Sequence, residues 1–318
     1  MRAFVTGGAG FIGSTLADRL LAGGHRVTAF DNFSSGQRDF VAQSLAHPDY
    51  QLIEGDLLDK DRLREAVRGH DVVFHLAANA DVRHGLEHPR RDLDQNTIAT
   101  FNVLESMREG SVRRIVFSST GSIYGEPDVF PTPEDCPFPV QTSLYGASKL
   151  ACEGLISAYC TGYGFSGWVF RFVSILGERY THGHVFDFVK QLRADPANLK
   201  ILGDGKQRKS YLYVQDCVEA MLLALEKQPQ GYYVFNLGTD EYVSVNESVS
   251  VITKVMGVRP DLAYTGGERG WIGDSPFIFL DCAKMRSLGW APRLRIAAAI
   301  ERTTRYLLLN PWLLDRRS

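Results

Sequence analysis

Tyr145 and Lys149 are the two residues whose types and spacing point most directly to chemistry. They stand four positions apart in the run YGASK, which places both side chains on one face of a helix. A phenol has an ordinary pKa near ~10, too high for a base at neutral pH, but a nearby ammonium and a cationic nicotinamide ring both lower it. Ser118, Ser119 and Thr120 end the preceding predicted strand, and one of these hydroxyls is placed to share a proton with Tyr145. The alternative is a Tyr/Lys pair on a solvated helix face, so the pair predicts a proton acceptor only beside a cofactor site.

A glycine-rich turn supplies that cofactor site. The segment TGGAGFIG follows directly on the predicted strand Arg2–Thr6 and opens a helix. Gly7 permits the tight turn, Gly10 lets backbone N–H groups approach a pyrophosphate, and Gly13 lets the helix pack close to the strand. The helix N-terminus then attracts the phosphates. Taken alone, the same glycines are also compatible with a plain turn between a strand and a helix.

Acidic and small residues after the next three strands extend the cofactor prediction. Asp31 ends the second strand, where a carboxylate accepts hydrogen bonds from the adenosine ribose and repels a 2′-phosphate, so NAD is favoured over NADP. Asp56 follows the third strand and suits the adenine amino group, or else caps a helix. The other residues expected to contact the cofactor are Phe11, Ile12, Asn32, Ser34, Ser35, Gly36, Leu57, Ala77, Ala78, Ala80, Ser118, Tyr145, Lys149 and Phe172.

These residues need a sheet whose strands end at one edge, and the hydrophobic pattern predicts such a sheet. Strands are expected at Arg2–Thr6, Arg26–Asp31, Gln51–Glu54, Asp71–Leu76, Arg113–Ser118, Gly167–Phe172 and Tyr232–Asn236. Helices are expected at Ile12–Ala22, Lys60–Arg68, Arg91–Glu109, Tyr145–Gly162, Val185–Ala194, Val214–Glu226, Val245–Met256 and Ile296–Leu309. Alternation of this kind implies right-handed βαβ units and a parallel sheet covered on both faces. The predicted fold is therefore α/β, a Rossmann-type doubly wound parallel sheet with a smaller, interleaved C-terminal substrate domain.

The domain organisation follows from a change of pattern after Ser174. We expect an NAD-binding domain over residues 1–173, with residues 214–243 added to it, and a substrate domain over residues 174–213 and 244–318.

Composition excludes several other classes of protein. The 318 residues carry a net charge of −2 without a long run of one sign, so nonspecific nucleic-acid binding is not expected. Apolar runs fall well short of the ~20 residues that span a bilayer, and the strand beginning at Arg2 leaves no room for a secretory signal. Five scattered cysteines lack CxxC spacing, so we expect a cytoplasmic protein with reduced thiols and no metal site.

Taken in order, the phrases TGGAGFIG, DNFSSG, GDL, LAANADVRH, FSSTGSIYG and YGASK resemble the extended short-chain dehydrogenase/reductases that act on nucleotide-sugars. The resemblance continues through RFVSILGER, GDGKQRKSYLYVQD and DCAKMRSLGWAP, so it covers nearly the whole chain. It implies that NAD is retained, that Thr120, Tyr145 and Lys149 are the catalytic residues, and that the chain forms a homodimer. The dimer would be a four-helix interface made by Arg91–Glu109 and Tyr145–Gly162.

The two residues after Thr120 separate the reactions of this family. Its 4,6-dehydratases carry Asp-Glu there and its UDP-glucuronate decarboxylases usually a Glu at the second place, whereas this chain has Gly121 and Ser122. The chemistry left is removal of a hydride from a carbinol and its return. The resemblance therefore implies a UDP-sugar 4-epimerase that inverts C4 through a transient 4-keto sugar. Less favoured alternatives are a dehydratase or decarboxylase, and a non-catalytic NAD-sensing regulator, which would usually lack the Tyr/Lys pair.

The substrate pocket is expected to draw on several loops. Arg208 or Lys209 resembles the family's diphosphate-binding base, and the phrase QRKSY leaves both positions open. Arg269 is a second candidate, although the family's Arg-x-Gly-Asp is here Trp271-Ile272-Gly273-Asp274. Further candidate substrate contacts are Arg83, Lys200, Ile201, Leu202 and Phe186, with core packing an equal alternative for Phe186.

Ser174 helps to predict which sugar the substrate carries. It stands where most glucose-type epimerases have Asn and where UDP-glucuronate 4-epimerases often have Thr. The hydroxyls of Thr120, Ser122 and Ser174, with the N–H of Gly121, are able to donate hydrogen bonds to a C6 carboxylate. The sequence thus favours UDP-glucuronate and UDP-galacturonate, with UDP-glucose and UDP-galactose as the alternative.

Overall fold

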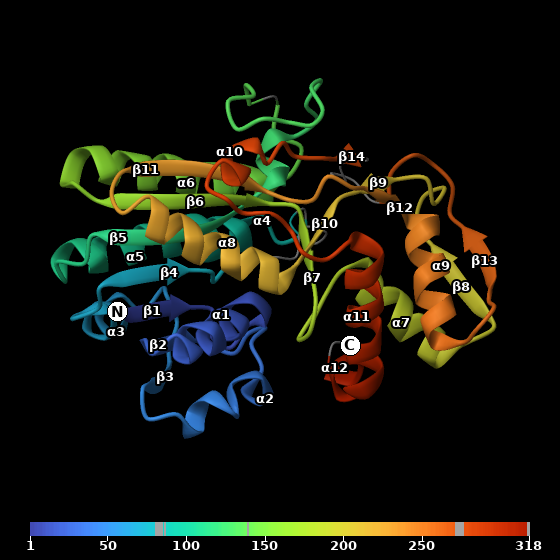
Figure 1. Cartoon of the computed structure of the whole chain (residues 1–318), viewed down its shortest axis with the longest axis horizontal. Helices are drawn as coiled ribbons and strands as arrows, with labels where there is room; N and C mark the ends of the chain where they lie inside the picture. The colour runs from blue at the N-terminus through green and yellow to red at the C-terminus, as the bar shows by residue number, and fades with distance from the viewer. Residues whose placement is uncertain (80–84, 86, 139, 271–276, 317–318) are drawn as a thin grey trace.

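The computed structural model describes residues 1–79, 85, 87–138, 140–270 and 277–316. Its centre is a seven-stranded parallel sheet with the order β3-β2-β1-β4-β5-β6-β11 (Figure 1). The strands are β1 (Arg2–Thr6), β2 (Arg26–Asp31), β3 (Tyr50–Glu54), β4 (Val72–His75), β5 (Arg114–Thr120), β6 (Ser166–Phe172) and β11 (Tyr232–Leu237). This order confirms the predicted Rossmann-type sheet.

Helices cover both faces of the sheet. One face carries α1 (Phe11–Ala22) and α8 (Val214–Lys227), and the other carries α3 (Lys60–Val67), α5 (Ala99–Glu109) and α6 (Leu144–Tyr163). Consecutive strand residues divide between the two cores, with Val5 in one and Phe4 in the other. Because side chains alternate along a strand, a strand buried on both faces is apolar at nearly every position.

A C-terminal lobe lies at the carboxyl edge of the sheet (Figure 1). Its helices are α7 (His184–Ala194), α9 (Val245–Met256), α11 (Ile296–Leu309) and α12 (Trp312–Arg316). Its strands are β7 (Ser174–Leu176) with β10 (Tyr211–Tyr213), β8 (Asn198–Ile201) with β13 (Asp261–Tyr264), and β9 (Arg208–Lys209) between β12 (Val243–Ser244) and β14 (Phe277–Ile278). We propose that residues 1–173 and 214–243 form the cofactor domain, since β11 pairs with β6 in the large sheet.

The long helix predicted over Arg91–Glu109 is wrong as one continuous α-helix. The structure has α4 (Pro89–Asp92), a π-helical segment η2 (Leu93–Ile98) and then α5. Within η2, Asn96 is buried and its amide donates to the Ser148 hydroxyl across 2.8 Å. A π-turn of this kind cannot be read from apolar periodicity, and such turns are frequent near functional sites.

The edge strand β11 is contacted by a short helix. The short helix α10 (Ala283–Arg286) lies against β11, and Lys284 Nζ donates to the carbonyl oxygen of Val234 across 2.7 Å. Among the described residues, no helix has both the length and the apolar character required to cross a bilayer.

Candidate active site

The glycine turn brings the start of α1 close to β1 and β4. Gly7 has a φ of +67°, and a Cβ there would lie 2.9 Å from the backbone of Ala77. A Cβ on Gly13 would lie 2.0 Å from the carbonyl oxygen of Gly7, so only glycine permits this approach. Gly10 is the N-cap of α1 and offers no side-chain cap, and the first turn has no acidic residue. The N–H groups of this turn therefore present positive potential to an anionic ligand.

The acid at the end of β2 is buried and held by the backbone. Asp31 Oδ2 accepts from the N–H of Ala9 across 2.9 Å, and Oδ1 accepts from that of Phe33 across 2.8 Å. Burial raises the pKa of Asp31, and these two N–H groups lower it. A Cβ on Gly36 would lie 2.7 Å from the carboxylate, so Gly36 lets the loop approach Asp31 closely, and Ser34 in the same loop is exposed.

Asp56 does not cap a helix, which was the alternative role expected for it. Its Oδ2 accepts from Asn32 Nδ2 across 2.9 Å, and its Oδ1 accepts from the N–H of Leu58 across 2.9 Å. The N-cap of α3 is Asp59, which accepts from the N–H of Arg62. The pair formed by Asn32 and Asp56 therefore lies at the strand ends, where the adenine end of a dinucleotide is expected.

Other residues predicted to bind the cofactor lie along the same edge. Ala77 follows β4 and its N–H donates to Thr6 Oγ1 across 3.2 Å. Phe11, Leu57, Ser118 and Phe172 are buried, Ile12 and Ala78 are half-buried, and Ser35 is exposed. Ala80, and the candidate substrate residue Arg83, lie outside the described residues.

The structure brings Tyr145 and Thr120 together. Tyr145 stands in the first turn of α6, whose N-cap Ser143 accepts from the N–H of Gly146, and its hydroxyl shares a hydrogen bond with Thr120. Thr120 Oγ1 also donates to Ser122 Oγ across 3.2 Å and accepts from the Ser122 N–H across 3.1 Å. Lys149 lies one turn further along α6, with Nζ 4.2 Å from the ring centre of Phe117.

The ionisation of this pair differs from the expectation drawn from sequence. Burial raises the pKa of Tyr145 to about 12, and the Thr120 hydrogen bond lowers it only in part. Asp92 and Cys152 raise it further, and Lys149 is not among these principal influences. Burial in turn lowers the pKa of Lys149 to about 8. The phenol therefore depends on a further positive charge, such as an oxidised nicotinamide ring, to become a base.

Gly121 and Ser122 follow Thr120 in the short helix η3 (Gly121–Tyr124). A Cβ on Gly121 would lie 3.3 Å from both the carbonyl oxygen of Phe172 and Cγ2 of Ile278. Ser174, in β7, is exposed. These residues place small groups and hydroxyls, without a carboxylate at positions 121 and 122, around Thr120.

The small sheet around β9 separates the two candidate diphosphate bases. The Arg208 guanidinium lies 4.3 Å from the ring centre of Phe277 and is exposed. Lys209 points to the other side, because side chains alternate along a strand. Its register partner Ile278 contacts the Gly121 region, and Lys209 contributes to lowering the pKa of His184.

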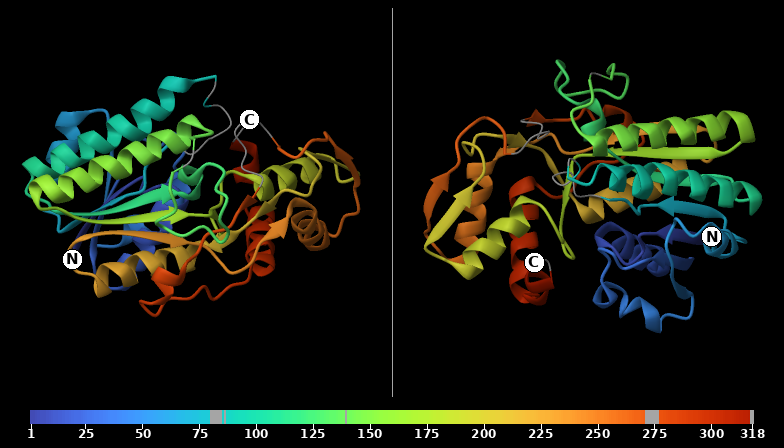
Figure 2. Two further views of the ribbon diagram at one scale, coloured as in Figure 1. Left: turned by 90° about the horizontal axis from the view of Figure 1, so that it is seen from above. Right: turned by 180° about the vertical axis from the view of Figure 1, so that it is seen from behind.

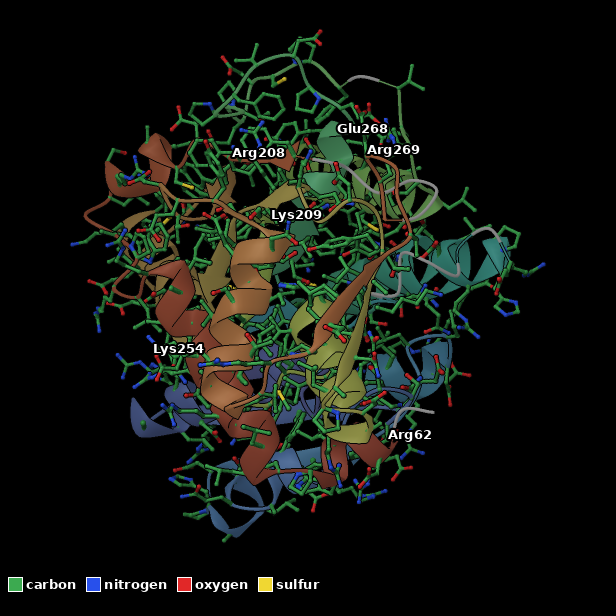
Figure 3. The ribbon with its side chains drawn as sticks, turned by 90° about the vertical axis from the view of Figure 1, so that its right-hand side faces the viewer. Arg62, Arg208, Lys209, Lys254, Glu268 and Arg269 are labelled. Carbon is green, nitrogen blue, oxygen red and sulfur yellow. The ribbon has the colours of Figure 1, made fainter. Side chains whose placement is uncertain are left out.

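The remaining candidate substrate residues are spread out. Figure 3 shows Arg208, Lys209 and Arg269 gathered at one end of the C-terminal lobe. Arg269 forms a two-pronged ion pair with Glu126, at 2.5 and 3.0 Å, and this pair lowers the pKa of Glu126. Phe186 and Ile201 are buried in the core, whereas Lys200 and Leu202 are exposed. The segment 271–276 lies outside the described residues.

One polar cluster beneath Tyr145 was missed from the sequence. Asn79 donates from its amide to Asp92 Oδ1 across 2.9 Å, and its N–H donates to Asn96 Oδ1 across 2.8 Å. Asn96 donates to Ser148 Oγ, which donates to the carbonyl oxygen of Tyr145 across 2.8 Å. The only available signal was an unusual density of Asn and Asp in a segment expected to be plain helix.

Comparisons with known proteins agree with this arrangement. The model of the NAD dependent epimerase/dehydratase family matches residues 3–238. The UDP-glucose 4-epimerase of Mycolicibacterium smegmatis is 34% identical over 313 residues, covering 96% of this chain and 98% of that protein. A crystal structure of a UDP-galactose 4-epimerase is 38% identical, with a TM-score of 0.88 and coverage of 98% and 100%. The structure of UDP-glucuronic acid 4-epimerase from Bacillus cereus, with UDP-glucuronic acid and NAD, is 26% identical, with a TM-score of 0.89 and coverage of 98% and 100%.

The chain belongs to the NAD dependent epimerase/dehydratase family. Within that family it is an NAD-dependent isomerase of the nucleotide-sugar 4-epimerase type, one of the extended short-chain dehydrogenase/reductases, as the motifs predicted. Its residues fit the cofactor: the uncapped N-terminus of α1 suits a pyrophosphate, and Asp31 suits a ribose without a 2′-phosphate.

Proposed function

We propose that this isomerase interconverts UDP-glucose and UDP-galactose by inverting C4. The relative at 34% identity is a UDP-glucose 4-epimerase, and the UDP-galactose 4-epimerase structure is 38% identical, against 26% for the UDP-glucuronic acid enzyme. These likenesses favour the alternative over the glucuronate preference drawn from Ser174. The observation that carries the reaction type is that Thr120 lies close enough to the Tyr145 hydroxyl to lower its pKa, with Lys149 one turn away on the same helix.

In this proposal the chain's own groups move one proton and hold the sugar. Bound NAD supplies a hydride acceptor that is regenerated in every cycle. Tyr145 removes the proton from the 4-hydroxyl and later returns it, while Thr120 shares that proton and fixes the oxygen. Lys149 would hold the nicotinamide ribose of the bound cofactor. Between the two transfers the 4-keto sugar turns about its diphosphate link and presents its other face.

The surroundings of Thr120 support inversion over elimination. A dehydratase needs an additional acid and base beside the catalytic hydroxyl, and Gly121 and Ser122 provide neither. Glu126 follows a few residues later, but its carboxylate is engaged by Arg269. A carboxylate held in an ion pair is a poor proton acceptor, because the guanidinium keeps its pKa low.

We infer that Lys209 binds the diphosphate of the substrate. It shares a strand face with Ile278, which reaches the Gly121 region, whereas the Arg208 guanidinium stacks on Phe277 and Tyr242. Replacing Lys209 with Met should raise KM for the UDP-sugar at least tenfold with a smaller effect on kcat, since a charge-assisted contact contributes ~1.5–3 kcal/mol. Arg208→Met is the matched control and should change KM less than threefold, roughly the effect of a rim charge.

The substrate is tested by offering UDP-glucose and UDP-glucuronate separately and separating the products by anion-exchange chromatography. We expect a larger kcat/KM for UDP-glucose, with UDP-galactose as product. A larger kcat/KM for UDP-glucuronate would refute the proposed sugar and leave the 4-epimerase chemistry intact. A stable keto product formed with loss of water or carbon dioxide would refute the reaction type as well.

We also propose a homodimer through α5 and α6. These helices lie side by side on one face of the sheet (Figure 2). Leu93, Ile98 and Phe101 are exposed on η2 and α5, and Leu144 is exposed at the start of α6. Apolar side chains grouped on neighbouring helices are typical of a surface covered by a partner.

A further inference from the structure

A buried ion pair lies directly behind the catalytic hydroxyls, and the proposed proton and hydride transfers do not involve it. The side chains of Glu153 on α6 and Arg171 on β6 are 4% and 5% exposed. Arg171 Nη2 donates to Oε2 across 2.8 Å, and Nε donates to Oε1 and Oε2 across 3.2 and 3.3 Å. Burying two charges is expensive unless their polar atoms are matched, so such a pair calls for a specific reason.

Glu153 ties the catalytic helix to the catalytic strand. It follows Lys149 by four residues and Tyr145 by eight, so the three side chains lie along one face of α6. Its Oε1 accepts a hydrogen bond from the hydroxyl of Ser119, the residue that precedes Thr120 in β5. One carboxylate therefore contacts both elements that must keep Tyr145 and Thr120 within hydrogen-bond distance.

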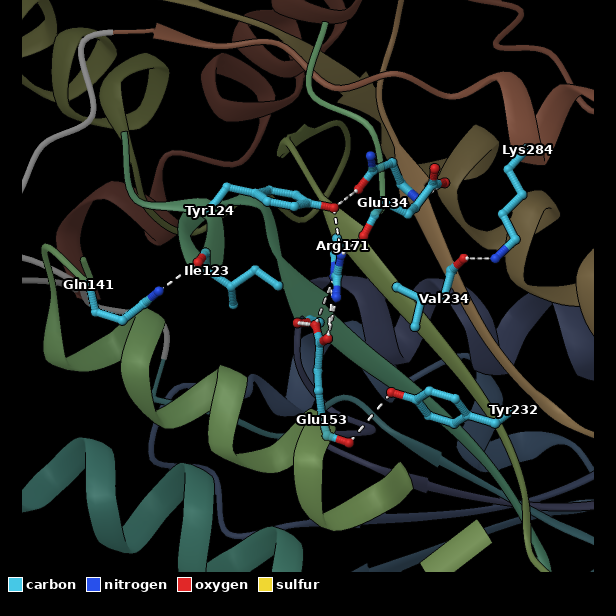
Figure 4. A network of polar contacts seen from close by, with 11 residues as sticks. Ile123, Tyr124, Glu134, Gln141, Glu153, Arg171, Tyr232, Val234 and Lys284 are labelled. Atoms are coloured by element: carbon cyan, nitrogen blue, oxygen red, sulfur yellow. Dashed lines mark hydrogen bonds and ion pairs between the residues drawn. The ribbon is translucent and has the colours of Figure 1, made fainter. Parts of the chain in front are cut away.

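Arg171 extends the same network to the loop beyond Thr120 (Figure 4). Its Nη1 donates to the hydroxyl of Tyr124, the last residue of η3, across 2.6 Å. The Tyr124 hydroxyl donates to Asn236 Oδ1 across 2.9 Å. Ser119, Arg171 and Asn236 are also register partners in the adjacent strands β5, β6 and β11. The guanidinium thus joins three strands and the loop that carries the substrate-facing hydroxyls.

The charge of Glu153 acts on Lys149. Lys149 is 2% exposed and its ammonium faces the ring of Phe117 on β5. The other titratable groups acting around it are Cys152 on α6 and His75 on β4. Burial lowers the pKa of Lys149 to about 8, while Cys152 and Glu153 raise it. At neutral pH the side chain of Lys149 is mostly protonated, because its pKa of about 8 lies only about one unit above that pH.

We propose that Glu153 is a positioning residue of the epimerase: its carboxylate, paired with Arg171, fixes α6 against the strand end that carries Thr120 and places a negative charge one helical turn from Lys149. This rests on the roles of Tyr145 and Lys149 in 4-epimerisation and is independent of which sugar is used. The two members of the ion pair should then have opposite effects on Lys149, although losing either one destabilises the fold.

The test follows the titration of Lys149 directly, by carbon-13 NMR of the lysine Cε atoms in the purified protein. The chain contains 9 lysines, and the signal absent from Lys149→Met identifies the one of interest. In Glu153→Gln the pKa of Lys149 should fall by about one unit, because the negative charge is lost and Arg171 remains. In Arg171→Gln it should rise by a similar amount. The double variant, which restores a neutral pair, should return it close to the wild-type value.

Ser119→Ala is the matched control, since it removes a contact to Glu153 without removing a charge, and it should leave the Lys149 titration nearly unchanged. In Glu153→Gln, kcat at neutral pH should fall about twofold from the lower pKa of Lys149 alone, and further where α6 shifts against β5, with KM changed less than twofold. Shifts of the Lys149 pKa in the same direction in both single variants, or an unchanged Lys149 pKa in Glu153→Gln, would overturn the proposal, because the ion pair would then only brace the fold. The NMR readout needs no turnover, so failure of the proposed substrate is distinguishable from failure of this inference.

Discussion

The ionisation of Tyr145 gives the sharpest test of the catalytic reasoning. Burial raises its pKa to about 12 in the protein without a bound cation, so the phenol is neutral at every physiological pH. A unit positive charge about 4 Å away contributes about 4 kcal/mol at an effective dielectric constant of about 20. That energy corresponds to about 3 pKa units. With oxidised NAD bound, we therefore expect a pKa for Tyr145 near ~9.

The assay compares the ultraviolet difference absorption of tyrosinate in NAD-loaded and NAD-free protein as the pH is raised. Tyr145→Phe, loaded in the same way, is subtracted to isolate this one phenol among 13 tyrosines. The phenolate form increases as pH rises toward the pKa, so kcat of the loaded enzyme should rise about tenfold between about pH 6 and 7, below the range in which Lys149 loses its proton. A kcat that is flat over this range, or a tyrosinate signal independent of NAD, would refute the argument that the cofactor's charge activates Tyr145.

Three further outcomes are expected. Tyr145→Phe should lower kcat by about 10²–10⁴-fold with KM nearly unchanged, measured by product chromatography; a loss below tenfold would remove Tyr145 as the base. Gly13→Ala should lower the thermal unfolding temperature and the NAD content of the purified protein, because its Cβ would lie 2.0 Å from the Gly7 carbonyl oxygen. Gly154→Ala on α6 is the control, since its Cβ would meet nothing within 4 Å, and it should be neutral or stabilising; equal losses in both would contradict the steric argument. Phe101→Glu should shift the protein from dimer to monomer in light scattering after size exclusion, and an unchanged mass would exclude α5 from the interface.

The parts of the fold that sequence predicts best are those set by local pattern. The bounds of β1 and β2 were predicted correctly, because each is a short apolar run that ends at a turn residue or an acid. Gly7 and Gly13 were equally readable, since a turn after a strand leaves few alternatives to glycine. The segment Leu93–Ile98 was not, because its π-turn depends on buried contacts to Asn79 and Ser148 that are distant in sequence.

Parts of the candidate site depend on distant pairings and on burial. The sequence left Arg208 and Lys209 as equal candidates for the diphosphate base. Only the pairing of β9 with β12 and β14 shows that their side chains lie on opposite faces of this small sheet. The charge state of Lys149 was assumed from its residue type, whereas its burial lowers its pKa to about 8. Glu153 and Arg171 were not recognised, because a carboxylate on a helix and a guanidinium on a strand normally indicate exposed positions.

The hydrogen bond from the Lys284 ammonium to the carbonyl oxygen of Val234 affects the tendency of the protein to aggregate at high concentration. β11 ends the seven-stranded order, and an outermost strand is a template on which a second molecule can add its own backbone. Lys284 occupies one acceptor of that strand with a charge, and α10 covers the strand beside it. Edge-to-edge aggregation would have to displace a hydrated cation first, so this border of the sheet is protected while the helical faces remain available for association.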